Sequence, residues 1–179
     1  KSVKTAFLYT EADVKDQKML GKLNGLTKKF PNDARLGLYR GMILQDLKRP
    51  KQALQEYRRI AELDADGATL NSIAWRMLED YKLKDDEVLQ LAHRAAQLKP
   101  APGILDTVGW IYFRKGDFEQ AEFWLYAAYK ADPNFAEITE HVIELERVTK
   151  DFQGWKAAYQ SLIADEPLKG FYYSNFASD

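Results

Sequence analysis

The chain has 179 residues, of which 46% are hydrophobic and 30% are charged, and its formal net charge is −1. These values are ordinary for a folded protein in water, and no apolar run approaches the roughly 18–20 residues that a membrane-spanning helix needs. With no cysteine in the chain, disulfides and thiolate metal sites are excluded.

Apolar residues recur at helical spacing along most of the chain, and turn residues divide the pattern into segments. Asp33, Asp85 and Asp117 each precede a segment and are expected to cap its helix. Residues 1–12 fit either the end of a first helix or an extended segment. No strand-period run occurs elsewhere, so the sequence predicts an all-α fold. The predicted helices are Asp13–Phe30, Asp33–Lys48, Pro50–Leu63, Ala68–Lys82, Asp85–Leu98, Gly103–Lys115, Phe118–Ala131, Phe135–Thr149 and Phe152–Ala164.

The segment Pro102–Pro133 carries the clearest pattern of small and large residues. Small side chains at Gly109 and Ala121 allow two helices to approach closely, and Tyr112 and Leu125 fill the space beside them. A proline then ends the second helix. The segment therefore predicts an antiparallel helix pair whose closest contact in the chain joins Gly109 and Ala121.

The same offsets recur at Gly41, Ala53 and Tyr57, and between these copies lies a third with a longer turn at Asp80–Glu87. Units of this kind, about 34 residues long, resemble the tetratricopeptide repeat. The resemblance implies an all-α solenoid of antiparallel helix pairs forming a right-handed superhelix, a single domain overall. The predicted divisions are a degenerate half or full repeat at 1–32, repeats at 33–66, 67–101 (longer turn) and 102–134, a divergent repeat at 135–167 and an aromatic tail at 168–179.

In this family the first helix of each pair lines a concave groove. Two positions of that helix face the groove: the one directly after the small residue, as Met42 after Gly41, and the one four residues before it, as Leu38. The resemblance thus implies a groove with apolar and aromatic residues in its middle and acidic residues toward its C-terminal end. Tryptophan is common where proteins bind each other, although packing against the neighbouring repeat would equally explain it. The projected partner-binding residues are Leu38, Met42, Asn71, Trp75, Leu78, Asp106, Trp110, Phe113, Glu140 and Glu144.

Repeats that clamp the carboxylate of chaperone tails carry Lys, Asn and Arg where this chain has Met42, Trp75 and Trp110, so that role is not expected. Residues 70–145 instead resemble the tandem in bacterial envelope-associated repeat proteins, including outer-membrane lipoproteins and polysaccharide-secretion proteins. The resemblance implies a non-enzymatic scaffold or adaptor for a protein partner, periplasmic or outer-membrane associated, with a cytoplasmic location as the alternative. Another reading is a segment of a larger polysaccharide-export or secretion protein that docks an enzyme or a pore component.

No catalytic, cofactor or metal site is predicted. His93 and His141 are the two histidines and are expected to be structural or surface residues. The sequence has no HExxH motif, glycine-rich phosphate loop or nucleophile elbow. Asp64–Gly67 resembles the start of a calcium loop, but Trp75 replaces the bidentate glutamate. Gly67 is instead expected to permit a left-handed turn between helices.

Nucleic-acid binding is not expected, because the projected groove carries acids and no lysine. Charge is uneven: residues 1–50 hold 11 Lys and Arg against 5 Asp and Glu, and residues 101–150 hold 5 against 9. The tail 168–179 carries four aromatics and is expected to cap the last helix pair or to enter a groove, in the second case permitting self-association. The chain begins at Lys1, which suggests an excised domain or a processed chain.

Overall fold

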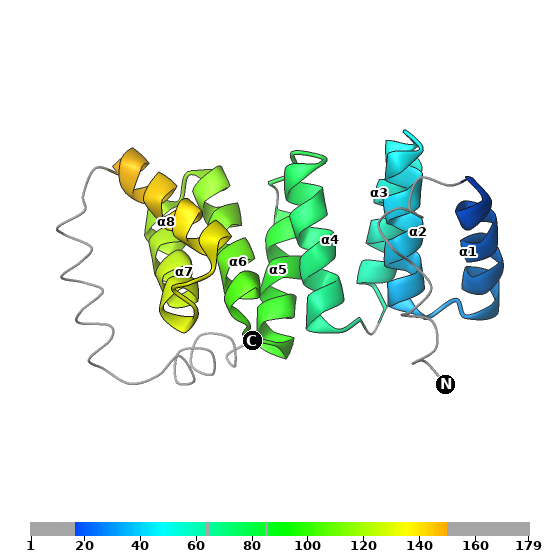
Figure 1. Ribbon diagram of the computed structural model, residues 1–179, viewed down its shortest axis with the longest axis horizontal. Coiled ribbons are helices and arrows are strands. Elements are labelled where there is room, and N and C mark those ends of the chain that lie inside the picture. Colours follow the sequence, from blue (N-terminus) through cyan, green and yellow to red (C-terminus); the bar gives the residue numbers. More distant parts are fainter. Residues whose placement is uncertain (1–16, 64, 85, 150–179) are drawn as a thin grey trace. The chain divides into compact units, whose positions relative to one another are not determined.

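The computed structural model describes residues 17–63, 65–84 and 86–149, shown as coloured ribbon in Figure 1. Predictions for residues 1–12, for the cap Asp85, for the helix 152–164 and for the tail 168–179 lie outside these residues. The helices of the described residues are α1 (Gln17–Lys29), α2 (Ala34–Asp46), α3 (Pro50–Ala61), α4 (Gly67–Glu79), α5 (Asp86–Leu98), α6 (Pro102–Lys115), α7 (Phe118–Ala131) and α8 (Ala136–Thr149).

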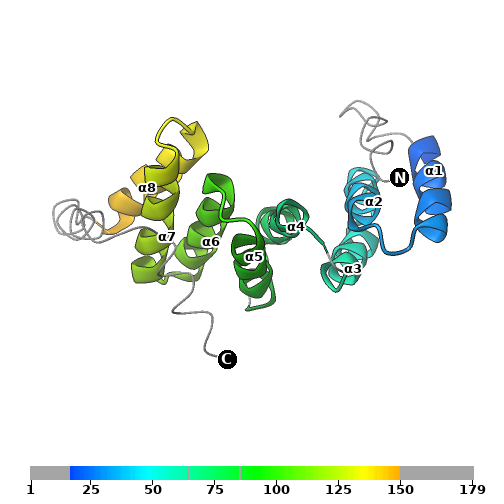
Figure 2. The ribbon, with the colours of Figure 1, turned by 90° about the horizontal axis from the view of Figure 1, so that it is seen from below.

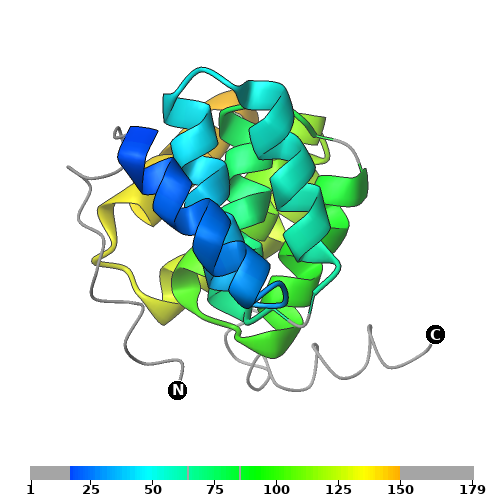
Figure 3. The same cartoon turned by 90° about the vertical axis from the view of Figure 1, so that its right-hand side faces the viewer.

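The all-α prediction is confirmed, and the helices pack in adjacent pairs as expected for helical repeats. Helix α2 packs on α3, and α6 packs on α7 (Figure 2). Helix α1 lies against α2 (Figure 3). The chain divides into two compact units, and the division falls inside α4 between Ile73 and Ala74. None of the described helices has the length and apolar character needed to cross a bilayer.

Two predicted helix caps are confirmed. The Asp33 carboxylate accepts a hydrogen bond from the Leu36 backbone N–H at 3.1 Å, and Asp117 accepts one from the Gln120 N–H at 3.2 Å. Each satisfies a backbone donor that the first turn of a helix cannot pair internally. The loop between α6 and α7 is short because Gly116 ends α6 in the left-handed conformation, with φ of 83°.

The expectation of a left-handed turn at Gly67 is wrong. Gly67 is the first residue of α4, and the preceding Asp66 accepts a hydrogen bond from the Thr69 N–H at 2.8 Å. An aspartate before a helix satisfies a first-turn donor directly, so the chain can enter α4 without a left-handed residue. Left-handed residues occur instead at Lys48 and Lys82, in the turns that follow α2 and α4.

The α6–α7 pair is close at Gly109, but its neighbour is Leu125 rather than Ala121. A Cβ on Gly109 would lie 2.7 Å from Leu125 Cγ and 2.8 Å from the Leu125 backbone nitrogen. Helical side chains lean toward the N-terminus of their helix, so the residue one turn further along α7 reaches this spot. The ring of Tyr57 approaches Gly41 more closely still in the α2–α3 pair. The prediction that Gly109 and Ala121 form the closest contact is therefore wrong.

The core of the second unit supports the face on which α6 and α8 meet. Ala121, Leu125, Tyr126, Val142 and Leu145 form a buried cluster between α7 and α8. Partly buried rings from α6 and α7 pack against it. These contacts fix α6 and α8 on the same scaffold helix, which holds the polar and aromatic side chains described below in place.

Candidate functional site

Three helices of the second unit place aromatic and charged side chains together: the C-terminal half of α4, then α6 and α8. On α6, Asp106, Trp110 and Phe113 follow one another at helical spacing and so share a face. Trp75 and Glu79 are four residues apart on α4 for the same reason. Helix α8 contributes His141.

The four rings Trp75, His141, Trp110 and Phe113 form an aromatic column. Trp110 stacks on His141, with centroids 3.9 Å apart and planes 13° from parallel, and on Phe113 at 4.6 Å and 9°. Trp75 lies 5.9 Å from His141 at a tilt of 40°. Each tryptophan and Phe113 is only half-buried, so the column is in part open to solvent.

A buried hydrogen-bonding contact joins His141 of the column to Asp106. Nδ1 of His141 is 2.9 Å from each carboxylate oxygen of Asp106, and the two residues are 9% and 3% exposed. A buried carboxylate is costly unless it is hydrogen-bonded, and the imidazole of His141 meets that need. The pair therefore fixes the orientation of the ring on which Trp110 stacks.

Glu79 holds the other edge of Trp110. Its Oε1 accepts a hydrogen bond from the indole Nε1–H at 3.2 Å and from Arg114 Nη1 at 2.6 Å. Lys82 pairs with its Oε2 at 3.2 Å. Burial raises the pKa of Glu79, but the hydrogen bonds from Lys82 and Trp110 and the charge of Arg114 outweigh it and leave the pKa below its ordinary value. Glu79 is thus a carboxylate that anchors the indole.

Comparison with known families adds to this geometry. The family model described as the tetratricopeptide repeat matches residues 103–135. Residues 103–135 are thus similar to a tetratricopeptide repeat. This repeat consists of α6 and α7, and Asp106, Trp110 and Phe113 all lie on its first helix.

A relative with the same repeat comes from Pseudomonas aeruginosa. The chain is similar to the TPR repeat-containing protein PA4667 of that bacterium, with 30% identity over 119 residues. The match covers 65% of the chain and 20% of the relative, so the chain spans about a fifth of the length of the curated relative it matches. No solved structure matches.

The structure places the ten projected groove residues differently from one another. Leu78 is 1% exposed and Asp106 3%, so both lie in the interior rather than on an open surface. Leu78 is an apolar side chain that packs in the interior. Asp106 is held in the interior by its contact with His141. Glu140 is exposed on α8, while Glu144 is less so and pairs with Arg147 at 2.6 Å. Half-buried positions are occupied by Leu38, Met42, Asn71, Trp75, Trp110 and Phe113.

A single groove through all ten residues stays a prediction, since Leu38, Met42 and Asn71 belong to the first unit and the others to the second. Sequence reasoning missed the contribution of His141 and of Glu79. A signal for His141 existed: it directly follows Glu140, a projected groove position.

The other histidine, His93, lies on α5 in a packed environment. Its Nε2 is 3.1 Å from the Tyr112 hydroxyl, and its ring meets Trp124 edge-on at 5.3 Å between centroids. Burial lowers the pKa of His93 to about 4, so the ring is neutral near pH 7. Within the described residues, no group of three or more His, Cys, Asp and Glu side chains is placed to hold a metal ion.

Proposed function

We propose that the chain is a non-enzymatic protein-binding scaffold or adaptor, and that the second unit binds a partner segment across α4, α6 and α8. Tetratricopeptide repeats are protein–protein interaction modules, and α6–α7 is such a repeat. The observation that carries the proposal is the half-open aromatic column. Aromatic side chains bury a large area on binding and lose little rotamer entropy.

The column is also held in its geometry before any partner arrives. Glu79 fixes the indole edge of Trp110, and the Asp106–His141 pair fixes the ring stacked on it. Side chains ordered in advance lose less entropy on association, which favours affinity. Exposed Glu140 lies next in sequence to His141 on α8. The chemistry therefore favours a partner segment with an apolar or aromatic anchor and a neighbouring basic residue.

Site-specific cross-linking provides the first test. A photoreactive phenylalanine at Glu140 should capture a partner, whereas the same residue at Gln90, exposed on α5, should not. The affinity of the captured partner is then measured for Trp75→Ala and Trp110→Ala. If the two tryptophans are anchors, each substitution should weaken binding by about 2 kcal/mol, or about thirtyfold. Unchanged affinity of the folded fraction of both variants would contradict the proposal.

Charge reversal at an exposed position tests binding without disturbing the folded core. Glu140→Lys changes an exposed side chain and should weaken the binding of a basic partner. The control Glu119→Lys makes the same change of charge on α7, also at an exposed position. Equal effects of the two variants would indicate attraction by net charge rather than a site on α8.

We further propose that this module works in a bacterial envelope assembly, periplasmic or outer-membrane associated. The resemblance of residues 70–145 to envelope-associated repeat proteins supports this. The alternative is a segment of a larger polysaccharide-export or secretion protein, in which the repeats dock an enzyme or a pore component. Cell fractionation tests the location: recovery in the cytoplasmic fraction would contradict an envelope role. The identity of the cross-linked partner separates the two assemblies.

A further inference from the structure

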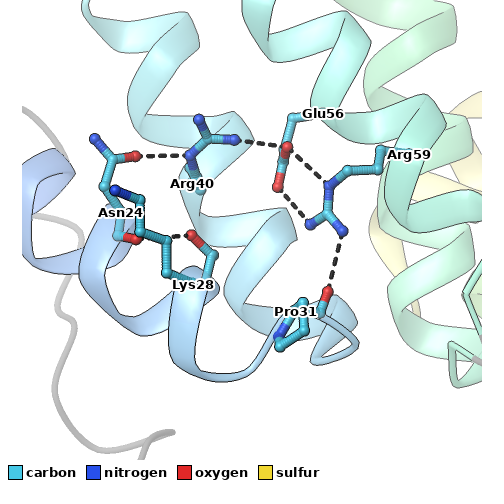
Figure 4. Close-up of a pocket in the computed structure, with 7 residues that line it drawn as sticks. Asn24, Lys28, Pro31, Arg40, Glu56 and Arg59 are labelled. Atoms are coloured by element: carbon cyan, nitrogen blue, oxygen red, sulfur yellow. Dashed lines mark hydrogen bonds and ion pairs between the residues drawn. The ribbon is translucent and has the colours of Figure 1, made fainter.

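The first unit contains a polar cavity of about 420 Å³ between α1, α2 and the start of the α1–α2 connection, with α3 closing one side (Figure 4). Its lining includes Asn24, Lys28, Pro31, Arg40, Glu56 and Arg59. A volume of this size lies within the range of small-molecule sites. It lies in a different unit from the aromatic column, and the projected groove residues do not line it.

One buried carboxylate holds both arginines of the cavity. Glu56, whose side chain is 5% exposed, accepts from Arg40 Nη1 at 2.6 Å and from Arg59 Nη2 at 2.8 Å. Arg59 Nε also donates to Glu56 at 3.1 Å, which makes this contact bidentate. Figure 4 shows Glu56 between the two guanidinium groups. Both oxygens of the carboxylate are therefore engaged, and they fix the two guanidinium groups.

Further contacts keep the guanidinium groups in place without using all their donors. Arg40 Nε donates to the Asn24 amide oxygen at 2.8 Å, and Arg59 Nη1 donates to the Pro31 carbonyl at 3.0 Å. A guanidinium has five N–H donors. Arg40 uses two nitrogens in these contacts, and no described residue bonds its Nη2 group, which can therefore donate to a ligand. The side chains remain 31% and 41% exposed.

The charges of the cavity do not balance. Among the described residues that line it, three cationic side chains, Lys28, Arg40 and Arg59, face one carboxylate, which leaves an excess of two positive charges. Across the described parts of the chain, the Lys28 ammonium has no hydrogen-bond or ion-pair partner. Asn24 also lines the cavity, and its amide oxygen already accepts from Arg40. A doubly charged acceptor of hydrogen bonds would match both the excess charge and the donors.

We propose that this cavity binds a phosphate monoester, carried either by a small molecule or by a phosphorylated protein side chain. A phosphate monoester carries about −1.5 to −2 charges at pH 7 and offers three acceptor oxygens. Arg40 and Arg59 supply planar donors from fixed positions, and Lys28 supplies a point charge at the rim. A single carboxylate would leave about one positive charge uncompensated.

Titration of the whole chain at 0.15 M salt, followed by NMR chemical shifts, tests the site. The probes are O-phosphoserine, a short phosphoserine peptide, the same peptide without phosphate, and free glutamate. Saturable binding of O-phosphoserine alone indicates a small-molecule ligand, and tighter binding of the phosphopeptide indicates a protein ligand. Either result supports the proposal. Equal binding of glutamate or of the unphosphorylated peptide overturns it, as does no binding of either phosphorylated probe.

Variants show whether the cavity is the place of binding. Lys28→Gln should weaken phosphoserine binding about tenfold, whereas Lys22→Gln, an equal charge change at an exposed position of α1, should leave it within about twofold. Arg40→Gln should weaken it further, and a thermal melt shows whether that variant is folded. Because the Lys28 ammonium has no hydrogen-bond or ion-pair partner among the described residues, its variant stays informative even if Arg40→Gln unfolds. Equal losses for Lys28→Gln and Lys22→Gln overturn the assignment.

Discussion

Gly109 is the position where the α6–α7 packing can be tested with one methyl group. In Gly109→Ala the added Cβ would lie 2.7 Å from Leu125 Cγ and 2.8 Å from the Leu125 backbone nitrogen. The side-chain carbon can rotate away, but the nitrogen is part of α7 and cannot move without shifting the helix. Overpacking of this kind costs about 1–3 kcal/mol, and alanine regains about 1 kcal/mol of helix propensity. We expect a net loss of about 1–2 kcal/mol.

Gly103, in the first turn of the same helix, provides the matched control. No atom lies within 4 Å of a Cβ placed there. Gly103→Ala should therefore keep the folded contacts and stabilise the chain by about 0.4–1 kcal/mol, because alanine restricts the unfolded chain. The same chemical change thus has opposite effects at two positions of one helix.

Urea unfolding followed by circular dichroism and tryptophan fluorescence measures both variants. The comparison uses the midpoint and the slope of each transition, since repeat proteins do not always unfold in one step. The reasoning is refuted if Gly109→Ala is as stable as the parent chain while Gly103→Ala gains stability. That result would mean that α7 does not lie against Gly109 through its backbone.

Three further predictions concern the second unit. His141→Leu leaves the buried Asp106 carboxylate without its partner and should cost about 3–5 kcal/mol in urea unfolding; an Asp106→Leu/His141→Leu double variant that loses the full sum of the single effects would contradict the pairing. His93 has its pKa lowered from 6.5 to about 4, so the unfolded state gains a proton first and stability should fall as pH drops from about 6.5 to 4; His93→Gln should lose less stability between pH 7 and pH 5 than the parent chain, and equal losses would exclude this cause. Ala121→Leu should overpack a fully buried position and cost about 1–3 kcal/mol by thermal or urea unfolding, and a variant of unchanged stability would show that Ala121 is not in the core.

The fold was predictable because its determinants are local. Helical spacing and capping residues such as Asp33 and Asp117 are readable within a few positions, and both caps act as expected. The close approach of α7 to Gly109 could also be predicted from the sequence. Its neighbour, Leu125, could not, because it depends on the direction in which the side chains of α7 point. The left-handed residues Lys48 and Lys82 were not predictable, since lysine carries no signal for that conformation.

The site was less predictable because it depends on residues distant in sequence. Asp106 and His141 are 35 positions apart, and Glu79 and Trp110 are 31 apart. Repeat spacing places such residues on neighbouring helices but does not specify which side chains turn toward each other. It therefore assigned Asp106 to an open surface, whereas the contact with His141 places it inside. The arginine cavity in the first unit gave no sequence motif at all, because its residues come from three different helices and a connection.

The contacts of Trp110 decide which experiments can separate binding from folding. Its ring stacks on both His141 and Phe113 and its Nε1–H is bound to Glu79, so replacing it disturbs the second unit as well as the binding of any partner. Trp75 makes a looser, tilted contact with His141, so its loss should cost less stability. Exposed Glu140 adjoins the column without supporting it. A partner that binds the column should therefore bind more weakly to Glu140→Lys at nearly unchanged stability, and more weakly to Trp75→Ala at a smaller stability loss than Trp110→Ala causes. A column that only supports the fold predicts no change in affinity for either variant.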